Sequence, residues 1–378
     1  MIEKRIQKLN QKIGEGLYLS ALQDFASGRT SRERPGALLW GLSALVVACP
    51  YVFAALGAGL LFVDFPNLLA LVFGGAFLGL GWMLRPRKPQ LPVGAVGRDS
   101  LPETFALLDA ISAQLDAPKV SKVVLDNQFN AYAAEVRNTP IVGIGALLWL
   151  ASDRPQRLAV LGHELGHLAH RDTRRIALPD RALMVLNAWQ NLLDMDHYVD
   201  AHTGVLERES NGIFADLVSA ALRGIVDTLA WAILKLSFAE SQKAEYLADA
   251  SGLRVAGRQA SLTALDLLVR IEASGALRSG ILPRQGEAGF DFLSRLAGTV
   301  DQLPPDQAAR ALAAHSAEKL SLDTTHPPTA YRQAFINGLP EALLEPPLEI
   351  ANWAAIEVEL KAHFEKIGRR EIAAFEVQ

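Results

Sequence analysis

The sequence predicts a mainly α-helical fold with a small β-sheet, preceded by an N-terminal hairpin of two transmembrane helices. Three observations carry this prediction. Asp64 is the only charged residue between positions 35 and 84. Short stretches between 119 and 144, the first of them rich in valine, are typical of strands, and the chain from 154 onward is mostly typical of helices. We therefore divide the chain into a basic N-terminal segment (1–34), the hairpin (35–84) and a folded domain (92–378).

Composition excludes several classes of protein. Half of the 378 residues are hydrophobic, which is far more than a disordered chain contains. The single cysteine, Cys49, excludes a small disulfide-bonded module. Lysine and arginine number 37 against 41 aspartate and glutamate residues, so the net charge is -4 and no nucleic-acid partner is expected.

The predicted hairpin consists of two apolar runs, 36–63 and 65–84, each long enough for a membrane helix of about 20 residues. Residues 63–67 (VDFPN) between them have the composition of a turn. A buried helical hairpin in a soluble core is the alternative. Arginine and lysine flank both outer ends, and the connecting loop carries none. The positive-inside rule therefore predicts a multi-pass protein of the inner (cytoplasmic) membrane, with both termini and the folded domain in the cytoplasm.

Two other segments have amphipathic helical patterns. Residues 2–13 have apolar residues at helical spacing with basic residues between them, so this segment either lies on anionic membrane lipid or packs on the folded domain. Residues 213–239 are apolar apart from a stripe of four charged residues. We expect them to form a helix that packs on the folded domain or lies in the membrane interface, in preference to a third span.

The folded domain begins after a short linker at 91–94. Residues 101–115 have helical periodicity, and three stretches at 119–125, 129–133 and 140–144 are expected to be short strands.

The strongest chemical signal is the H-E-x-x-H motif formed by His163, Glu164 and His167. Histidines four residues apart on a helix share one face and can bind one metal ion. Glu164 is then placed to act as a general base on water. The surrounding residues 158–168 are mostly apolar, and Asp153 with the following Arg-Pro pair is a plausible helix start. Polar groups in such a buried helix need partners, which a metal ion provides.

A catalytic zinc ion takes three protein ligands, so a third residue is needed. Glu245 and Asp249 lie four residues apart on one predicted helix. Glu245 can ligate the metal while Asp249 accepts a hydrogen bond from a ligand histidine. His170 lies on the face of the two motif histidines and competes for the third position. A solvated acidic face is the other interpretation of the Glu245–Asp249 pair.

Four stretches, in this order, resemble a known family: FNAYA (129–133), VLGHELGHLAHRD (160–172), SQKAEYLADA (241–250) and THPPTAYR (325–332). The chain is similar to the integral-membrane zinc metallopeptidases of the HtpX and CAAX prenyl protease type. The similarity covers about 120–340 together with the hairpin.

The resemblance implies a zincin-like α+β domain that binds one Zn²⁺ per chain and cleaves protein or peptide substrates. It selects Glu245 over His170 as the third ligand beside His163 and His167. Glu164 becomes the catalytic base and Asp249 supports the site. The expected protein is a membrane-anchored endopeptidase, with a role in membrane protein quality control or in regulated proteolysis.

The resemblance also implies groups that bind substrate. The strand with Asn130, Ala131 and Tyr132 is expected at the edge of the cleft, where it pairs with the substrate backbone. His326 or Tyr331 is expected to assist catalysis at the oxyanion, although His326 also suits a structural turn before two prolines. Arg332 is expected to form an ion pair near the site.

The chain departs from the better-known members of this family, which carry further spans between the metal helix and the glutamate helix. Here that interval holds the charged segment 213–239. Two other functions compete with the peptidase interpretation: a membrane-bound scaffold with a structural zinc site, and a transporter or lipid-modifying protein with a chance motif. An intact Glu164 argues against the scaffold, because a structural site needs no general base.

Overall fold

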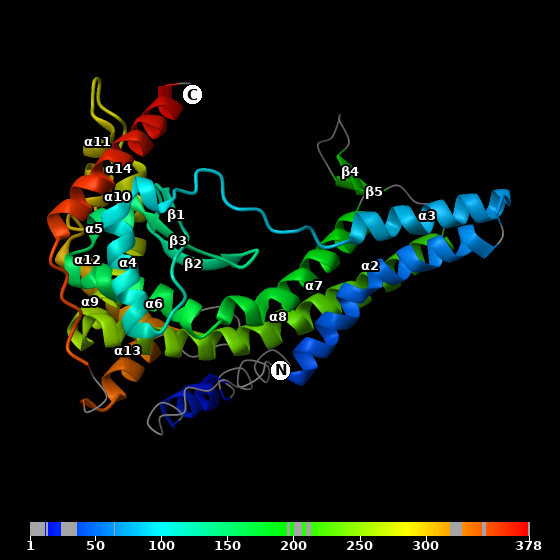
Figure 1. Cartoon of the computed structure of the whole chain (residues 1–378), viewed down its shortest axis with the longest axis horizontal. Helices are drawn as coiled ribbons and strands as arrows, with labels where there is room; N and C mark the ends of the chain where they lie inside the picture. The colour runs from blue at the N-terminus through cyan, green and yellow to red at the C-terminus, as the bar shows by residue number, and fades with distance from the viewer. Residues whose placement is uncertain are drawn as a thin grey trace. The chain divides into compact units, whose positions relative to one another are not determined.

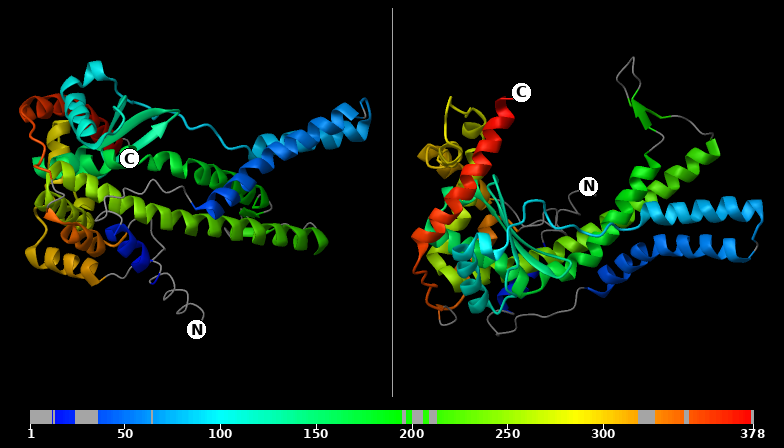
Figure 2. Two further views of the ribbon diagram at one scale, coloured as in Figure 1. Left: turned by 60° about the horizontal axis from the view of Figure 1, so that its bottom comes forward. Right: turned by 45° about the horizontal axis from the view of Figure 1, so that its top comes forward.

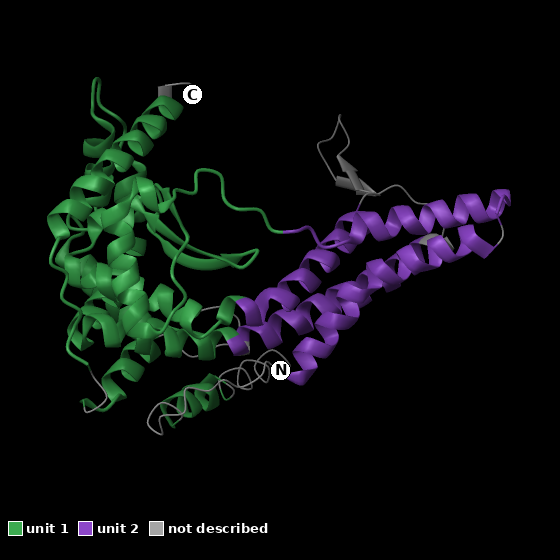
Figure 3. Ribbon diagram, viewed as in Figure 1, with its two compact units in different colours: residues 1–32, 89–173, 241–378 green, residues 33–88, 174–240 purple. Residues whose placement is uncertain are grey.

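The computed structural model describes residues 12, 14–23, 36–63, 65–194, 197–199, 206–208, 213–317, 327–341 and 345–376. It confirms a mainly helical chain with a small sheet and N-terminal apolar helices. The chain forms two compact units (Figures 1 and 3). Unit 1 comprises 1–32, 89–173 and 241–378, and unit 2 comprises 33–88 and 174–240.

Unit 2 contains the hairpin of α2 (Ala37–Val63) and α3 (Leu68–Leu84), which lie side by side (Figure 2). The Asn67 side chain accepts a hydrogen bond from the Leu69 N–H at 2.9 Å, and this cap starts α3 three residues later than the apolar run. A Cβ atom at Gly57 would lie 2.6 Å from the Gly74 carbonyl oxygen, so the glycines permit the close approach of the two helices.

The helix α8 (Ile213–Ala256) joins the helix predicted at 213–239 to the predicted helix of Glu245 and Asp249. Its first part belongs to unit 2, where Val226 and Ile233 are buried against α2 and α7 (Asp172–Leu193). Two residues of the charged stripe bond to residues near the end of α7: Arg223 donates to Asp194, and Asp227 accepts from Gln190. The described residues of this segment therefore pack with α2 and α7 within unit 2.

Two helices of the described chain, α2 and the stretch Asp216–Ala256 of α8, have the length and apolar composition to cross a membrane. At 17 residues, α3 is a shorter apolar helix. Unit 2 thus contains the whole of α2 and the part of α8 up to residue 240.

Unit 1 is built around a three-stranded sheet of β1 (Lys122–Asp126), β2 (Ala131–Val136) and β3 (Thr139–Gly145) in the order β1-β3-β2. β3 pairs with β1 in parallel and with β2 in antiparallel orientation. All three strands lie within a few residues of their predicted positions. β2 is an edge strand of this sheet.

The core of unit 1 lies between this sheet and helices from distant parts of the chain. Fully buried residues include Phe105 of α4 (Pro102–Leu115), Val142 of β3 and Leu165 of α6 (Arg154–Ala169). The other helices of this unit are α5 (Ala146–Ala151), α9 (Arg258–Ala273), α10 (Gly275–Ser279), α11 (Gly289–Ala297), α12 (Pro305–Ala317), α13 (Thr329–Gly338) and α14 (Trp353–Glu376). A two-stranded sheet of β4 (His197–Val199) and β5 (Leu206–Arg208) lies between α7 and α8 in the chain.

The N-terminal segment is helical at 14–23 and packs on unit 1. Ala21 is buried beside Tyr246 and Phe335, and the Tyr18 ring centroid lies 5.8 Å from those of Tyr246 and Tyr331. The amphipathic stretch 2–13, apart from Lys12, lies outside the described residues.

Candidate metal centre

The helix α6 positions the two motif histidines because its start is fixed by a capping box. The Asp153 side chain accepts from the Gln156 N–H at 2.8 Å, and the Gln156 side chain accepts from the Asp153 N–H at 2.9 Å. With the first turn fixed, His163 and His167 fall on one face, with ring centroids 5.0 Å apart.

Close packing of α6 on α8 brings the third group to this face. A Cβ atom at Gly166 would lie 2.6 Å from the Ser251 Cβ, and one at Gly252 would lie 2.8 Å from the Ala159 carbonyl oxygen. Side chains at these two positions would hold the helices apart. Their absence lets Glu245, which is 5% exposed, reach the histidines.

His163, His167 and Glu245 each offer one ligand atom, and these atoms lie within 4.8 Å of one another. Each histidine Nε2 is 3.6 Å from one oxygen of the Glu245 carboxylate. This spacing allows one ion to bind all three atoms at about 2.0–2.2 Å, which is the usual length of zinc–nitrogen and zinc–oxygen bonds. The donor set, two imidazoles and a carboxylate, therefore fits zinc.

The other nitrogen of each ring is held by a carboxylate. His163 Nδ1 is 3.0 Å from Asp249, and His167 Nδ1 is 3.1 Å from Asp172. These bonds orient each ring so that Nε2 faces the cluster. Asp172 was missed by sequence reasoning. The signal was an acidic residue five positions after His167, at the start of the next helix.

The cluster carries an excess of negative charge. Burial lowers the pKa of His167, but the hydrogen bond to Asp172 and the carboxylates of Glu164 and Glu245 outweigh it and raise the pKa to about 9. The site thus attracts positive charge, as a cation site must.

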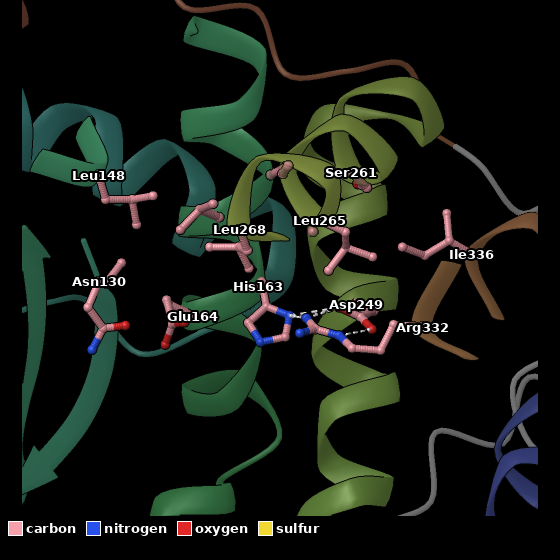
Figure 4. Close-up of a pocket in the computed structure, with 15 residues that line it drawn as sticks. Asn130, Leu148, His163, Glu164, Asp249, Ser261, Leu265, Leu268, Arg332 and Ile336 are labelled. Atoms are coloured by element: carbon pink, nitrogen blue, oxygen red, sulfur yellow. Dashed lines mark hydrogen bonds and ion pairs between the residues drawn. The ribbon is translucent and has the colours of Figure 1, made fainter. Parts of the chain in front are cut away.

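Arg332 of α13 forms the ion pair that was expected near the site. Its guanidinium donates to both Asp249 oxygens, at 2.6 and 2.9 Å, and is 3.8 Å from Glu245. Burial lowers the pKa of Arg332, and the Asp249 carboxylate more than restores it. Asp249 is therefore shared between His163 and Arg332, as Figure 4 shows.

Glu164 lies beside the cluster and faces the edge strand. Its carboxylate accepts a hydrogen bond from the Ala133 N–H at 3.0 Å. Because hydrogen-bonding directions alternate along a strand, the backbone groups of Ala133 point away from β3, as do those of Ala131. Glu164 and His163 also line a cavity of about 200 Å³ together with Asn130 and Ala131.

The remaining predicted residues lie elsewhere or outside the described chain. Tyr132 lies against β3, where a Cβ atom at Gly143 would be 2.1 Å from its ring. His170 ends α6, and its Nε2 is 3.2 Å from the Ser251 hydroxyl, away from the ligand atoms. Tyr331 stacks edge-on with Tyr18. His326 lies outside the described residues.

Comparison with known proteins agrees with this geometry. The model of peptidase family M48 matches residues 103–339, more than half of the chain. A protein named Protease HtpX homolog from Pyrobaculum calidifontis is 27% identical over 264 residues, covering 67% of this chain and 72% of the relative. Another of that name from Pyrococcus abyssi is 24% identical, covering 63% and 78%. A Protease HtpX from Acinetobacter baumannii is 27% identical, covering 60% and 67%. No solved structure matches.

The matched region contains the capped motif helix, the Glu245–Asp249 pair and Arg332. The chain therefore belongs to peptidase family M48, and it is a zinc metallopeptidase whose cluster of His163, His167 and Glu245 is its candidate zinc site.

Proposed function

We propose that the protein is a membrane-anchored zinc endopeptidase in which Glu164 is the general base. The observation that carries this proposal is the position of Glu164, whose carboxylate lines the same cavity as the metal ligand His163. A structural zinc site is completed by four protein ligands and has no use for such a carboxylate. Among the described residues, the cluster at α6 and α8 offers three ligands.

Each residue of the site has a defined task in this proposal. When bound to the three ligands, Zn²⁺ supplies a Lewis acid that polarises the peptide carbonyl and activates water. Glu164 takes a proton from the attacking water and returns it to the leaving amine. Asp249 and Asp172 hold the histidine rings in orientation, and Arg332 keeps Asp249 ionised.

The outer edge of β2 is proposed to bind the substrate backbone. Its outward-facing backbone groups at Ala131 and Ala133 lie beside Glu164, so an extended peptide that adds to this edge runs past the metal ligands. Of the three expected contact residues, Asn130 and Ala131 line the cavity, whereas the Tyr132 ring packs on β3 and its backbone pairs within the sheet.

Glu164→Gln tests the catalytic assignment. The variant is expected to bind one zinc ion per chain, measured by elemental analysis of the purified full-length protein, and to cleave no peptide. Glu349→Gln, at an exposed position away from the site, is the matched control and should retain both properties. Retained zinc-dependent cleavage in Glu164→Gln would sink the assignment.

We extend the proposal to location and role. The basic residues on both sides of the apolar hairpin support a chain with both ends and the peptidase unit in the cytoplasm. Contact with membrane lipid follows for the exposed apolar side chains of α2 and α3. Membrane proteins are then the nearest substrates, which supports quality control or regulated proteolysis. Reporter fusions within 63–67 and after 378 test the orientation, and a cytoplasmic hairpin loop would contradict it.

A further inference from the structure

The N-terminal helix (14–23) lies beside α13 in unit 1 (Figure 2). Its Leu22 side chain meets the last residue of α13, because a Cβ atom at Gly338 would lie 3.4 Å from the Leu22 Cδ2. Its Tyr18 side chain meets the first turn of α13. The family model matches from residue 103 onward, so this helix lies outside the region that the family shares.

Tyr18 bridges two chain neighbours of the zinc site. Its ring centroid lies 5.8 Å from that of Tyr246, at an interplanar angle of 64°, and 5.8 Å from that of Tyr331, at 80°. Tyr246 follows the ligand Glu245 in α8, and Tyr331 precedes Arg332 in α13. Edge-to-face rings at this distance attract one another. One side chain of the N-terminal helix therefore joins α8 to the turn of α13 that carries Arg332.

The start of α13 is capped by a residue without a polar side chain. This N-cap residue is Pro328, whose ring carries no hydrogen-bond acceptor. The polar contacts of α13 with α9 come later: Gln333 donates to Asp266 at 2.7 Å, and Arg258 donates to the Leu339 carbonyl oxygen at 2.7 Å. These bonds hold α13 on α9. They do not fix the distance between the first turn of α13 and α8.

That distance decides whether Arg332 reaches Asp249. The guanidinium donates to the two Asp249 oxygens at 2.6 and 2.9 Å, and the same carboxylate holds the His163 ring at 3.0 Å. A shift of the first turn by about 1 Å would lengthen the arginine bonds beyond about 3.5 Å, where such bonds are lost. Phe335 also contacts the Tyr246 ring, at 5.1 Å, but it belongs to the second turn of α13.

We propose that Tyr18 is a positioning residue of the zinc site, which holds the first turn of α13 on α8 and so keeps Arg332 on Asp249. This inference rests on the zinc centre of the proposed function. Loss of a contact outside the ligands weakens metal binding by about 10–100-fold, and Tyr18 acts one layer further out. We therefore expect Tyr18→Ala to weaken zinc binding by about 10-fold. Tyr18→Phe keeps the ring and both edge contacts and should bind zinc like the wild type.

The test is competition for zinc against a chromogenic chelator, with the purified full-length protein in detergent. Circular dichroism checks that each variant is folded. Leu19→Ala is the matched control, because Leu19 lies on the same helix and is 56% exposed, and it should bind zinc like the wild type. A merely structural role would lower the unfolding temperature of Tyr18→Ala and leave the zinc affinity of the folded protein unchanged.

A double-mutant cycle tests whether Tyr18 acts through Arg332. In Arg332→Leu the ion pair that Tyr18 supports is already lost. Adding Tyr18→Ala to that variant should therefore weaken zinc binding much less than it does in the wild type. Additive losses would show that Tyr18 does not act through the arginine, and would overturn the inference.

The other outcomes separate this inference from the function on which it rests. Wild-type zinc affinity in Tyr18→Ala refutes the positioning role and leaves the zinc centre intact. So does an equal loss of affinity in Tyr18→Phe or in Leu19→Ala. If Tyr18→Ala does not fold, Tyr18→Leu decides, because leucine fills the space without offering a ring edge: weaker zinc binding supports the role, and unchanged binding refutes it. If the wild type binds no zinc, both conclusions fall.

Discussion

Replacing Gly166 by alanine is expected to push α6 away from α8 and to weaken zinc binding. The new Cβ atom would lie 2.6 Å from the Ser251 Cβ, 2.7 Å from its hydroxyl oxygen and 3.2 Å from the Ala248 Cα. Carbon atoms pack at roughly 3.5–4.0 Å, so the helices must separate by on the order of 1 Å.

Two opposing terms set the change in stability. Overpacking in a close helix contact costs about 1–3 kcal/mol. The higher helix propensity of alanine returns up to about 1 kcal/mol. The effect on zinc is larger, because the histidines lie on α6 and Glu245 lies on α8, so the separation acts directly on the ligand set. Loss of an orienting contact outside the ligands already weakens metal binding by about 10–100-fold, and we expect at least that loss here.

The assay is competition for zinc against a chromogenic chelator, combined with thermal unfolding of the metal-free protein in detergent. Gly224→Ala is the matched control, because Gly224 lies on α8 and a Cβ atom there would meet no neighbouring atom within 4 Å. That variant should bind zinc like the wild type and unfold at the same or a slightly higher temperature. Wild-type zinc affinity in Gly166→Ala would refute the argument that helix contact positions the ligands.

Three more predictions follow from the groups around the ligands and from one ion pair elsewhere in unit 1. Asp172→Asn removes the charge that holds the His167 ring and should weaken zinc binding by about 10–100-fold in the chelator assay; unchanged affinity would contradict an orienting role. Arg332→Leu leaves the Asp249 carboxylate buried with its main partner gone, and should destabilise the protein by about 3 kcal/mol, seen as a lower unfolding temperature. Glu287 accepts hydrogen bonds from a neighbouring arginine, which lowers its pKa to about 2. Its contribution to stability is therefore complete above its unfolded pKa of about 4.5 and is lost as the pH falls toward 2. Glu287→Gln should be less stable than the wild type by about 1–2 kcal/mol at pH 7. This difference in the free energy of unfolding should become smaller below pH 4.

The elements that sequence predicted well are those with local causes. The capping box at Asp153, the four-residue spacing of His163 and His167, and the valine-rich strands all depend on neighbours in the chain. Such patterns act through helical and strand periodicity and need no tertiary information. The metal ligands of α6 belong to this group.

The features that sequence analysis missed depend on contacts between residues far apart in the chain, or on the change of direction between α6 and α7. Asp172 reaches His167 because Arg171 adopts a left-handed conformation (φ 58°) between α6 and α7, which no pattern indicated. The Tyr132 ring lies over Gly143 of β3, a contact between two strands that the sequence pattern does not indicate. The partners of the charged stripe on α8 were also unpredictable, because they come from the end of α7.

Because the Ala133 N–H already donates to Glu164, a peptide that binds at the edge of β2 must replace one hydrogen bond by another. An extended peptide that adds to the outer edge of β2 needs the Ala133 N–H, and that donor is already held by the Glu164 carboxylate. The substrate backbone must therefore displace the Glu164 carboxylate. The net free energy of its hydrogen bond to the Ala133 N–H is the difference between that bond and the one it replaces. Occupation of the strand edge thus frees the Glu164 carboxylate from the Ala133 N–H at the moment when a peptide is in place.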